Sequence, residues 1–154
     1  ASLEESAAEL NAWAAESMQV HGLALVDHSG LGDRSRVTSA DMMAVLLALH
    51  KTKDLKPLLK EFTMRDANRK VMNNHPISVH AKTGTLNFVS ALAGYIRTEA
   101  GNDLAFAIFT ANSTARAAGI ASGEEQPAGS KAWNRRSRRL QQRLLQRWAR
   151  RYTA

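Results

Sequence analysis

The sequence contains no cysteine among its 154 residues. This excludes disulfides, thiolate metal sites and a cysteine nucleophile. It also has no apolar run of the roughly 18 residues that would predict a transmembrane helix. Its first residues lack the basic stretch, apolar core and small-residue cleavage site of a signal peptide. With 44% hydrophobic and 23% charged residues, the composition is that of one globular domain or a large piece of one.

The net charge of +7 arises from the C-terminal end of the chain. Residues 131–154 hold nine of the 21 Lys and Arg residues and no acidic residue, whereas the other 130 residues carry 12 basic and 14 acidic side chains. We predict a final helix here, with one apolar face packed on a sheet and the arginines around its edges. The apolar face comprises Trp133, Leu140, Leu144 and Trp148. The alternative is a surface that binds nucleic acid or another acidic partner, and the apolar face favours packing over it.

Hydrophobic periodicity and turn residues predict a mixed α+β chain. We expect a helix over 2–18 that begins with a Ser2–Glu5 capping box, and a second over 38–50 that is capped by Thr38 or Ser39. We expect a short third helix over 55–62, with Pro57 in its first turn. We expect strands over 23–26, 77–81, 88–96 and 104–110, and loops over 63–75 and 114–131. Gly101 and Asn102 between the last two strands favour an antiparallel hairpin. The predicted fold is an antiparallel sheet with the N- and C-terminal helices on one face.

Several possible catalytic or metal-binding arrangements fail on their spacing. The five histidines are scattered, and no pair has the spacing of a metal site. Asp27, His28 and Ser29 are the residue types of a catalytic triad, but three consecutive side chains point apart and cannot form its relay. Gly30 and Gly32 do not extend to a dinucleotide-binding fingerprint. We therefore expect neither a metal nor a cofactor.

One short motif combines residues with a coherent chemistry, Lys82-Thr83-Gly84-Thr85. A lysine ammonium beside a threonine hydroxyl can hold a carboxylate. A glycine lets a second backbone lie against the strand, and the next N–H, on Thr85, can point at a developing oxyanion. Alone, the motif is short enough to occur by chance, and an ordinary lysine at the start of a strand is the simpler interpretation.

The motif does not stand alone. Residues 27–31, 36–38, 79–86 and 92–95 occur in an order that resembles the C-terminal part of D-alanyl-D-alanine carboxypeptidase/endopeptidases, the class C low-molecular-mass penicillin-binding proteins. The chain departs from that family at His28 and Phe88, where glycine is common. The resemblance implies a serine β-lactamase/transpeptidase-like domain, of which residues 1–154 would be the C-terminal part.

The resemblance also implies an activity and a set of partners. Enzymes of this family are serine peptidases that cleave the D-Ala-D-Ala bond of peptidoglycan stem peptides through an acyl-enzyme, and β-lactam antibiotics inhibit them. Carried across, Lys82 and Thr83 would hold the terminal carboxylate of the substrate, Gly84 would admit its backbone, and the Thr85 N–H would form half of the oxyanion hole. The protein would act in the periplasm or elsewhere outside the cytoplasm, with a signal peptide upstream of this chain.

The family's other two motifs, Ser-x-x-Lys and Ser-x-Asn, occur nowhere in residues 1–154. We therefore expect the nucleophilic serine to lie in an N-terminal part of the same protein, and this chain to be inactive alone. Two alternatives stay open at this point. One is an inactive, penicillin-binding-like binding module, and the other is the nucleic-acid or acidic-surface binder described above.

Overall fold

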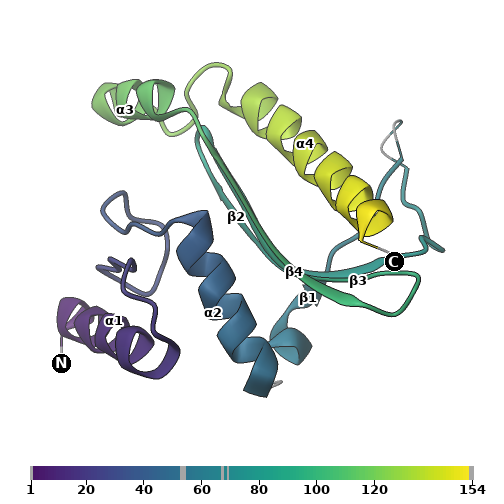
Figure 1. Ribbon diagram of the computed structural model, residues 1–154. Helices are drawn as coiled ribbons and strands as arrows, with labels where there is room; N and C mark the ends of the chain where they lie inside the picture. Colours follow the sequence, from purple (N-terminus) through teal and green to yellow (C-terminus); the bar gives the residue numbers. More distant parts are fainter. Residues whose placement is uncertain (1, 53–54, 67, 69, 153–154) are drawn as a thin grey trace. The chain divides into compact units, whose positions relative to one another are not determined.

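The computed structural model describes residues 2–52, 55–66, 68 and 70–152 (Figure 1). These residues form two compact units, with the boundary after Pro57. The first unit is helical, and the second contains all four strands of the described chain.

Two helices form the first unit, α1 over Leu3–Met18 and α2 over Ser39–Thr52. The capping box at the start of α1 is confirmed, since the Ser2 hydroxyl accepts from the Glu5 N–H and the Glu5 carboxylate accepts from the Ser2 N–H. Thr38 caps α2 in the same way, because its hydroxyl accepts from the Asp41 N–H at 3.1 Å. Both helix starts were therefore predictable from side chains three residues apart.

The predicted strand over 23–26 is wrong. Only Ala24 forms a bridge, to Arg36, and the neighbouring backbone bonds a side chain instead of a strand. The Asn11 amide donates to the Leu25 carbonyl at 2.9 Å and accepts from the Leu25 N–H at 3.1 Å. These two bonds satisfy the backbone polar groups of Leu25 and fasten the segment to α1, so that no ladder forms.

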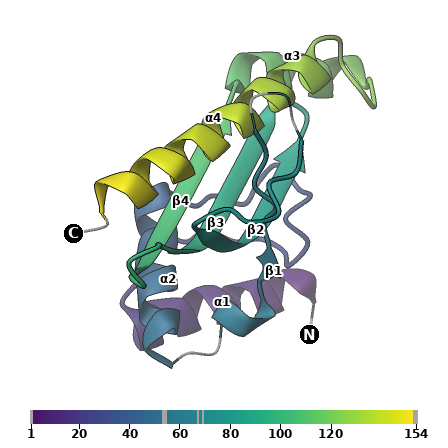
Figure 2. The same ribbon diagram turned by 90° about the vertical axis from the view of Figure 1, so that its right-hand side faces the viewer.

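The second unit is built on an antiparallel sheet in the order β1-β2-β3-β4 (Figure 2). Its strands are β1 over Lys60–Glu61, β2 over Ser78–Leu86, β3 over Val89–Arg97 and β4 over Asp103–Ala111. The predicted β3–β4 hairpin is confirmed, with full pairing from Val89↔Ala111 to Arg97↔Asp103. Gly101 adopts a φ of 85° in its turn, a conformation that glycine reaches without steric cost.

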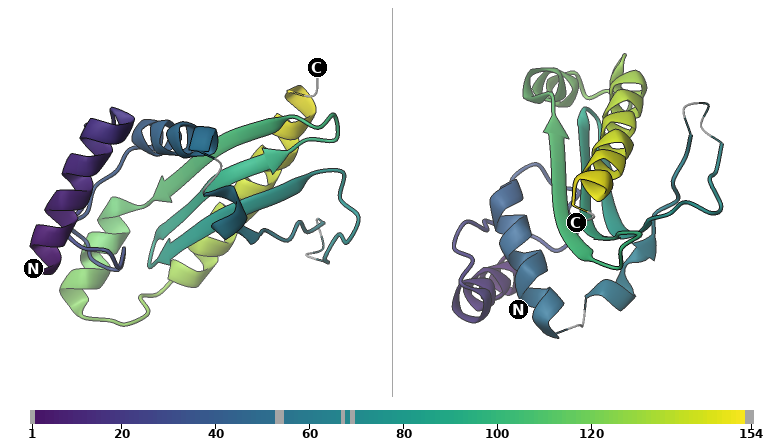
Figure 3. Two further views of the ribbon diagram at one scale, coloured as in Figure 1. Left: turned by 90° about the horizontal axis from the view of Figure 1, so that it is seen from below. Right: turned by 45° about the vertical axis from the view of Figure 1, so that its right-hand side comes forward.

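The segment between the two units differs from the prediction. The expected helix over 55–62 is a single 3₁₀ turn, η1 over Lys56–Leu58, followed at once by β1. The described residues of the predicted loop over 63–75 form no helix or ladder strand, as expected, apart from an isolated bridge between Arg65 and Val71. Residues 70–75 extend away from the sheet (Figure 3). The loop is not wholly exposed, however, because Met64 is 3% exposed and belongs to the hydrophobic core.

A third helix follows β4 where a flexible stretch was expected. Helix α3 runs over Ser113–Ser122, with the Asn112 side chain accepting from the Ala115 N–H at its start and Gly123 in the left-handed conformation at its end. The small residues that suggested flexibility are compatible with a helix, and its two caps define its ends.

Helix α4 covers one face of the sheet, over Ser130–Arg151 (Figure 2). Its contact face is rotated from the one predicted. The buried residues are Ser130, Asn134, Ser137, Gln141, Leu145 and Ala149. Leu140 is 46% exposed, while Leu144 and Trp148 are partly buried at the margin of the core. Polar groups help to fix this face, since the Gln141 amide donates to the buried Ser90 hydroxyl at 3.1 Å.

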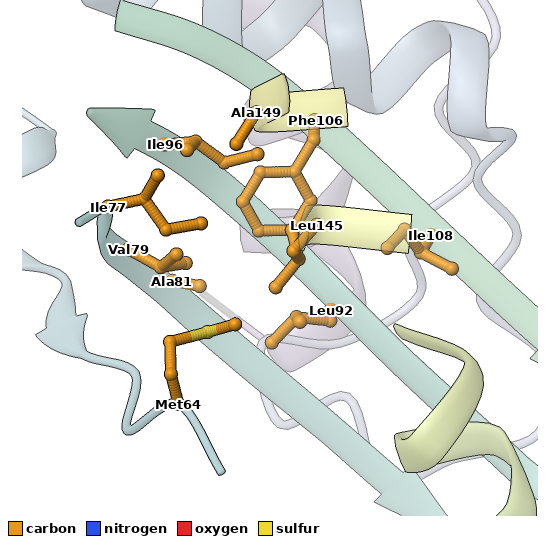
Figure 4. Close-up of a cluster of buried hydrophobic side chains, with 10 residues drawn as sticks. All are labelled: Met64, Ile77, Val79, Ala81, Leu92, Ile96, Phe106, Ile108, Leu145 and Ala149. Atoms are coloured by element: carbon orange, nitrogen blue, oxygen red, sulfur yellow. The ribbon is translucent and has the colours of Figure 1, made fainter. Parts of the chain in front are cut away.

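The core of the second unit lies between α4 and the sheet (Figure 4). It comprises Met64, Ile77, Val79, Ala81, Leu92, Ile96, Phe106, Ile108, Leu145 and Ala149. The α+β fold with an antiparallel sheet flanked by helices is therefore confirmed, as is the packing of the C-terminal helix on it. Packing of α1 on the same sheet stays a prediction. Within the described ranges, no helix combines the length and apolar character that a membrane crossing requires.

Candidate functional site

The four residues of the motif occupy the second half of β2, from Lys82 to Thr85. The first half of the strand carries the core residues Val79 and Ala81, whereas Lys82, Thr83, Gly84 and Thr85 are all exposed. The core thus fixes one half of the strand and leaves the other half accessible to a ligand.

This accessible half of β2 is an open edge of the sheet. On its inner side, β2 pairs with β3 along its whole length, from Ser78↔Arg97 to Leu86↔Val89. On its outer side it pairs with the two-residue strand β1, which contacts only His80 and Ala81 in the ladder. Among the described residues, no strand continues that pairing beyond Ala81. We name the outer side of residues 82–86 the open edge.

The backbone groups that face the open edge follow from the ladder. The Val79 carbonyl accepts from the Phe62 N–H at 2.7 Å, so residue 79 directs its polar groups outward. In an antiparallel sheet, alternate residues bond to opposite neighbours. The β2–β3 register is unbroken, so Thr83 and Thr85 also direct their N–H and C=O groups outward. A peptide laid along this edge would find the donors and acceptors of a further strand.

The Lys82 ammonium also reaches the open edge. Neighbouring side chains on a strand point to opposite faces, so Lys82 and Thr83 do not lie side by side on one face. The long lysine side chain bends back instead, and its Nζ donates to the Thr83 carbonyl at 2.7 Å. The positive charge therefore lies beside the outward-facing backbone of Thr83, where it could meet a carboxylate.

Two glycines near this edge have different roles. A Cβ on Gly94 of β3 would collide with the His80 carbonyl and lie 2.7 Å from the Ala81 Cα, so close packing of the two strands requires this glycine. A Cβ on Gly84 would meet only the Ala91 Cβ, at an ordinary 3.4 Å. The folded chain therefore does not require glycine at position 84. The absence of a side chain at Gly84 leaves room beside the strand for a ligand.

The hairpin that joins β2 to β3 ends in a residue with unusual geometry. Phe88 has a φ of 59°, in the left-handed region that glycine favours. Its ring is buried and meets the Trp133 ring edge-on, with 6.4 Å between the centroids. The departure from glycine at this position is thus offset by an aromatic contact that joins the hairpin to α4.

A hollow of about 400 Å³ adjoins the end of the motif. Its lining includes Thr85 from β2 and Lys131, Asn134 and Arg138 from α4. Asn134 is 7% exposed, and its Nδ2 donates to the Leu86 carbonyl while its buried Oδ1 has no partner among the described residues. The sequence pattern places Lys131 and Arg138 only on a basic helix surface. Their positions beside Thr85 follow from how α4 packs on the sheet.

The other sequence candidates are structural. Asp27 Oδ1 accepts from the Ser29 hydroxyl and from the Ser29 and Gly30 N–H groups, so it organises a turn. These bonds, led by the Ser29 hydroxyl, lower the pKa of Asp27, and the charge of Arg34 acts in the same direction. The His28 ring bonds the Ser6 hydroxyl at 2.9 Å, so no Asp-His-Ser relay forms. Within the described ranges, no three His, Cys, Asp or Glu residues gather as metal ligands would.

Comparison with solved structures supports this fold. The chain superposes on the Bd0816 predatory endopeptidase from Bdellovibrio bacteriovorus, solved in complex with immunity protein Bd3460, with a TM-score of 0.62 and 22% sequence identity. The match covers 91% of this chain and 36% of that one, so the chain spans about a third of the length of this structural relative. No curated protein gave a significant match.

A family profile matches more of the chain than the motifs alone. The profile of the D-Ala-D-Ala carboxypeptidase 3 (S13) family matches residues 5–132, which include most of α1, all of α2, the complete sheet and the start of α4. The match and the fold agree with the family resemblance identified from the motifs. The chain belongs to the D-Ala-D-Ala carboxypeptidase 3 (S13) family.

Proposed function

We propose that this chain supplies the substrate-binding strand of a serine D-Ala-D-Ala carboxypeptidase/endopeptidase that acts on peptidoglycan stem peptides. The observation that carries the proposal is the open edge of β2, where Thr83 and Thr85 direct backbone groups outward beside the Lys82 ammonium. Membership of the S13 family supports the reaction class. The substrate would pair with this edge as an added strand.

Each residue of the motif has a role in this proposal. Lys82 and Thr83 hold the terminal carboxylate of the substrate, and Gly84 leaves room for its backbone. The Thr85 N–H forms one half of an oxyanion hole for the tetrahedral intermediate. None of these groups is a nucleophile, so they bind and polarise the scissile peptide bond without breaking it.

The nucleophile is proposed to be a serine in another part of the same protein. No serine in residues 1–154 is followed three positions later by lysine or two positions later by asparagine. The serine Oγ would attack the carbonyl carbon of the penultimate D-Ala and lose its proton to a base. The C–N bond would break, the terminal D-Ala would leave with a proton, and water would hydrolyse the acyl-enzyme. A β-lactam would form the same acyl bond and hydrolyse slowly.

This reaction needs no metal or cofactor. Its substrate lies in the cell wall, so the protein would act outside the cytoplasm, in the periplasm where one exists, and a signal peptide would precede this chain. Residues 1–154 would then be the C-terminal part of a single penicillin-binding domain.

The test is acylation of the intact protein by a fluorescent penicillin, followed by gel electrophoresis and by mass spectrometry of the intact protein and of its proteolytic peptides. We expect the label on a polypeptide segment outside residues 1–154. We expect labelling of the Lys82→Ala variant to be roughly 10- to 150-fold slower, since a charge-assisted hydrogen bond contributes about 1.5–3 kcal/mol. Lys60→Ala is the matched control, because Lys60 is an exposed lysine on the adjacent strand β1. Label on this chain would contradict the assignment of the nucleophile. No label at all would favour an inactive binding module.

A further inference from the structure

A second, larger groove follows helix α4 and is strongly basic. It has a volume of about 1240 Å³ and lies between α4 and residues 61–66 and 68. Among the described residues, six cationic side chains line it, Arg65, Lys131, Arg135, Arg138, Arg139 and Arg143. Two acidic side chains of the described chain do so, Glu61 and Asp66. We name this the arginine groove.

Three cations that α4 contributes to the groove have no carboxylate partner among the described residues. Arg135, Arg139 and Arg143 are spaced four residues apart, so they lie on one stripe of the helix. Across the part of the chain that the structure describes, none of the three forms an ion pair with a carboxylate. Like charges at this spacing destabilise a helix, and an external anion would relieve that repulsion.

The composition of the groove disfavours two kinds of anionic partner. A single-stranded nucleic acid would need aromatic faces for its bases, but Trp133 and Trp148 are partly buried and Phe62 packs against the core. A lipid surface would need an exposed apolar face on the helix. Leu144, Leu145 and Trp148 pack against the core on the sheet instead, and Leu140 is the one large apolar residue of α4 that is exposed.

The groove is continuous with the candidate site. Lys131 and Arg138 line both the arginine groove and the hollow that contains Thr85. An anionic polymer lying along α4 would therefore pass beside the open edge of β2. Guanidinium groups match the planar, two-oxygen geometry of carboxylates.

We propose that the arginine groove binds carboxylate groups on the peptide branches of the cell-wall polymer, holding the polymer beside the open edge. The polymer assignment rests on the proposed function, whereas the preference for carboxylates rests on the groove itself. The groove retains the polymer between cleavage events, and the groups that bind the scissile bond stay those of β2.

Co-sedimentation of the intact protein with purified peptidoglycan tests this proposal. The variant Arg135→Gln/Arg139→Gln/Arg143→Gln removes three charges from the groove. The matched control, Arg136→Gln/Arg147→Gln/Arg151→Gln, removes three charges from exposed positions of α4 that do not line the groove. We expect binding about tenfold weaker for the groove variant, from three exposed ion pairs, and less than twofold weaker for the control. Amidation of the peptidoglycan carboxylates should remove this difference.

Several outcomes would overturn the proposal. Equal weakening by the two variants would show that net charge alone acts, and unchanged binding by the groove variant would exclude the groove. Tighter, groove-dependent binding to phosphatidylglycerol vesicles or to a 20-nucleotide single-stranded DNA would assign the groove to that partner instead. Arg139→Gln, compared with Arg136→Gln, repeats the test if the triple variant unfolds.

Penicillin acylation, measured in parallel, separates this proposal from the proposed function. We expect both triple variants to acylate at the wild-type rate, because none of the six arginines lines the open edge. A wild-type protein that binds carboxylate polymer through the groove but is not acylated would contradict the peptidase function alone. A protein that is acylated but binds peptidoglycan independently of the groove would contradict the groove alone.

Discussion

The substitution Gly84→Ala distinguishes a glycine that is required for ligand binding from one that is required for folding. The only close neighbour of the added methyl group would be the Ala91 Cβ, at 3.4 Å. Glycine in a strand is less stable than alanine by roughly 0.5–1 kcal/mol, because it loses more backbone freedom on folding. Gly84→Ala should therefore leave the free energy of unfolding unchanged or raise it by up to about 1 kcal/mol.

The same substitution should impair the proposed reaction. A methyl group here narrows the space beside the open edge, where a substrate strand would bond to Thr83 and Thr85. Losing two backbone hydrogen bonds of about 1 kcal/mol each lowers binding or acylation by about 30-fold. The assays are urea unfolding followed by tryptophan fluorescence, and the rate of acylation of the intact protein by a fluorescent penicillin.

Gly94→Ala is the matched control, since it is the same substitution on the neighbouring strand. Its methyl group would overlap the His80 carbonyl and force β2 and β3 apart, so we expect a loss of stability of about 3 kcal/mol. If Gly84→Ala destabilises the protein as much as Gly94→Ala does, the reasoning is refuted, because Gly84 would then be required for folding. Unchanged stability together with unchanged acylation would refute the pairing of substrate with this edge.

Three further predictions concern local structure. Phe88→Gly should be about 1 kcal/mol less destabilising than Phe88→Ala in urea unfolding. Both substitutions lose the contact with Trp133, but only glycine adopts a φ of 59° without strain. A more destabilising Phe88→Gly would contradict this. Leu145→Ala should cost about 2–5 kcal/mol, whereas Leu140→Ala on the same helix should cost under about 0.5 kcal/mol; similar costs would contradict the buried face assigned to α4. Ser29→Ala should raise the pKa of Asp27, measured by NMR titration, because the Ser29 hydroxyl is the main cause of its lowering. Because the pKa of Asp27 is lowered in the folded chain, its charged form stabilises the turn fully at a pH above the ordinary pKa of the group. This stabilisation is lost as the pH falls through the lowered pKa. An unchanged pKa in Ser29→Ala would exclude the Ser29 hydroxyl as its cause.

The sequence predicted those features of the fold that depend on neighbouring residues. The capping box of Ser2 and Glu5 and the Thr38 cap need only side chains three positions apart. The β3–β4 hairpin follows from two apolar runs joined at Gly101. Local hydrogen bonds and side-chain periodicity are sufficient in each case.

The wrong predictions have a common cause in contacts between distant residues. Residues 23–26 have the composition of a strand, but Asn11 takes the backbone bonds of Leu25. Met64 lies in a polar stretch, yet it packs into the core beneath α4. The stripe through Leu140 and the buried face through Leu145 are both helical patterns, so periodicity alone could not choose between them.

The features of the candidate site also divide into those that follow from local sequence and those that follow from contacts between distant residues. The sequence by itself determined the family and the Lys82–Thr85 motif, because these depend on residue types at fixed short spacings. The strand predicted over 77–81 ended before the motif, whereas β2 continues through it to Leu86. Only the tertiary structure decided that β1 pairs with His80 and Ala81 alone and leaves the rest of β2 open, and that Lys131 and Arg138 line the same hollow as Thr85. Strand pairing and helix packing join residues tens of positions apart, and the burial and backbone hydrogen bonding that select one pairing over another exist only in the folded chain.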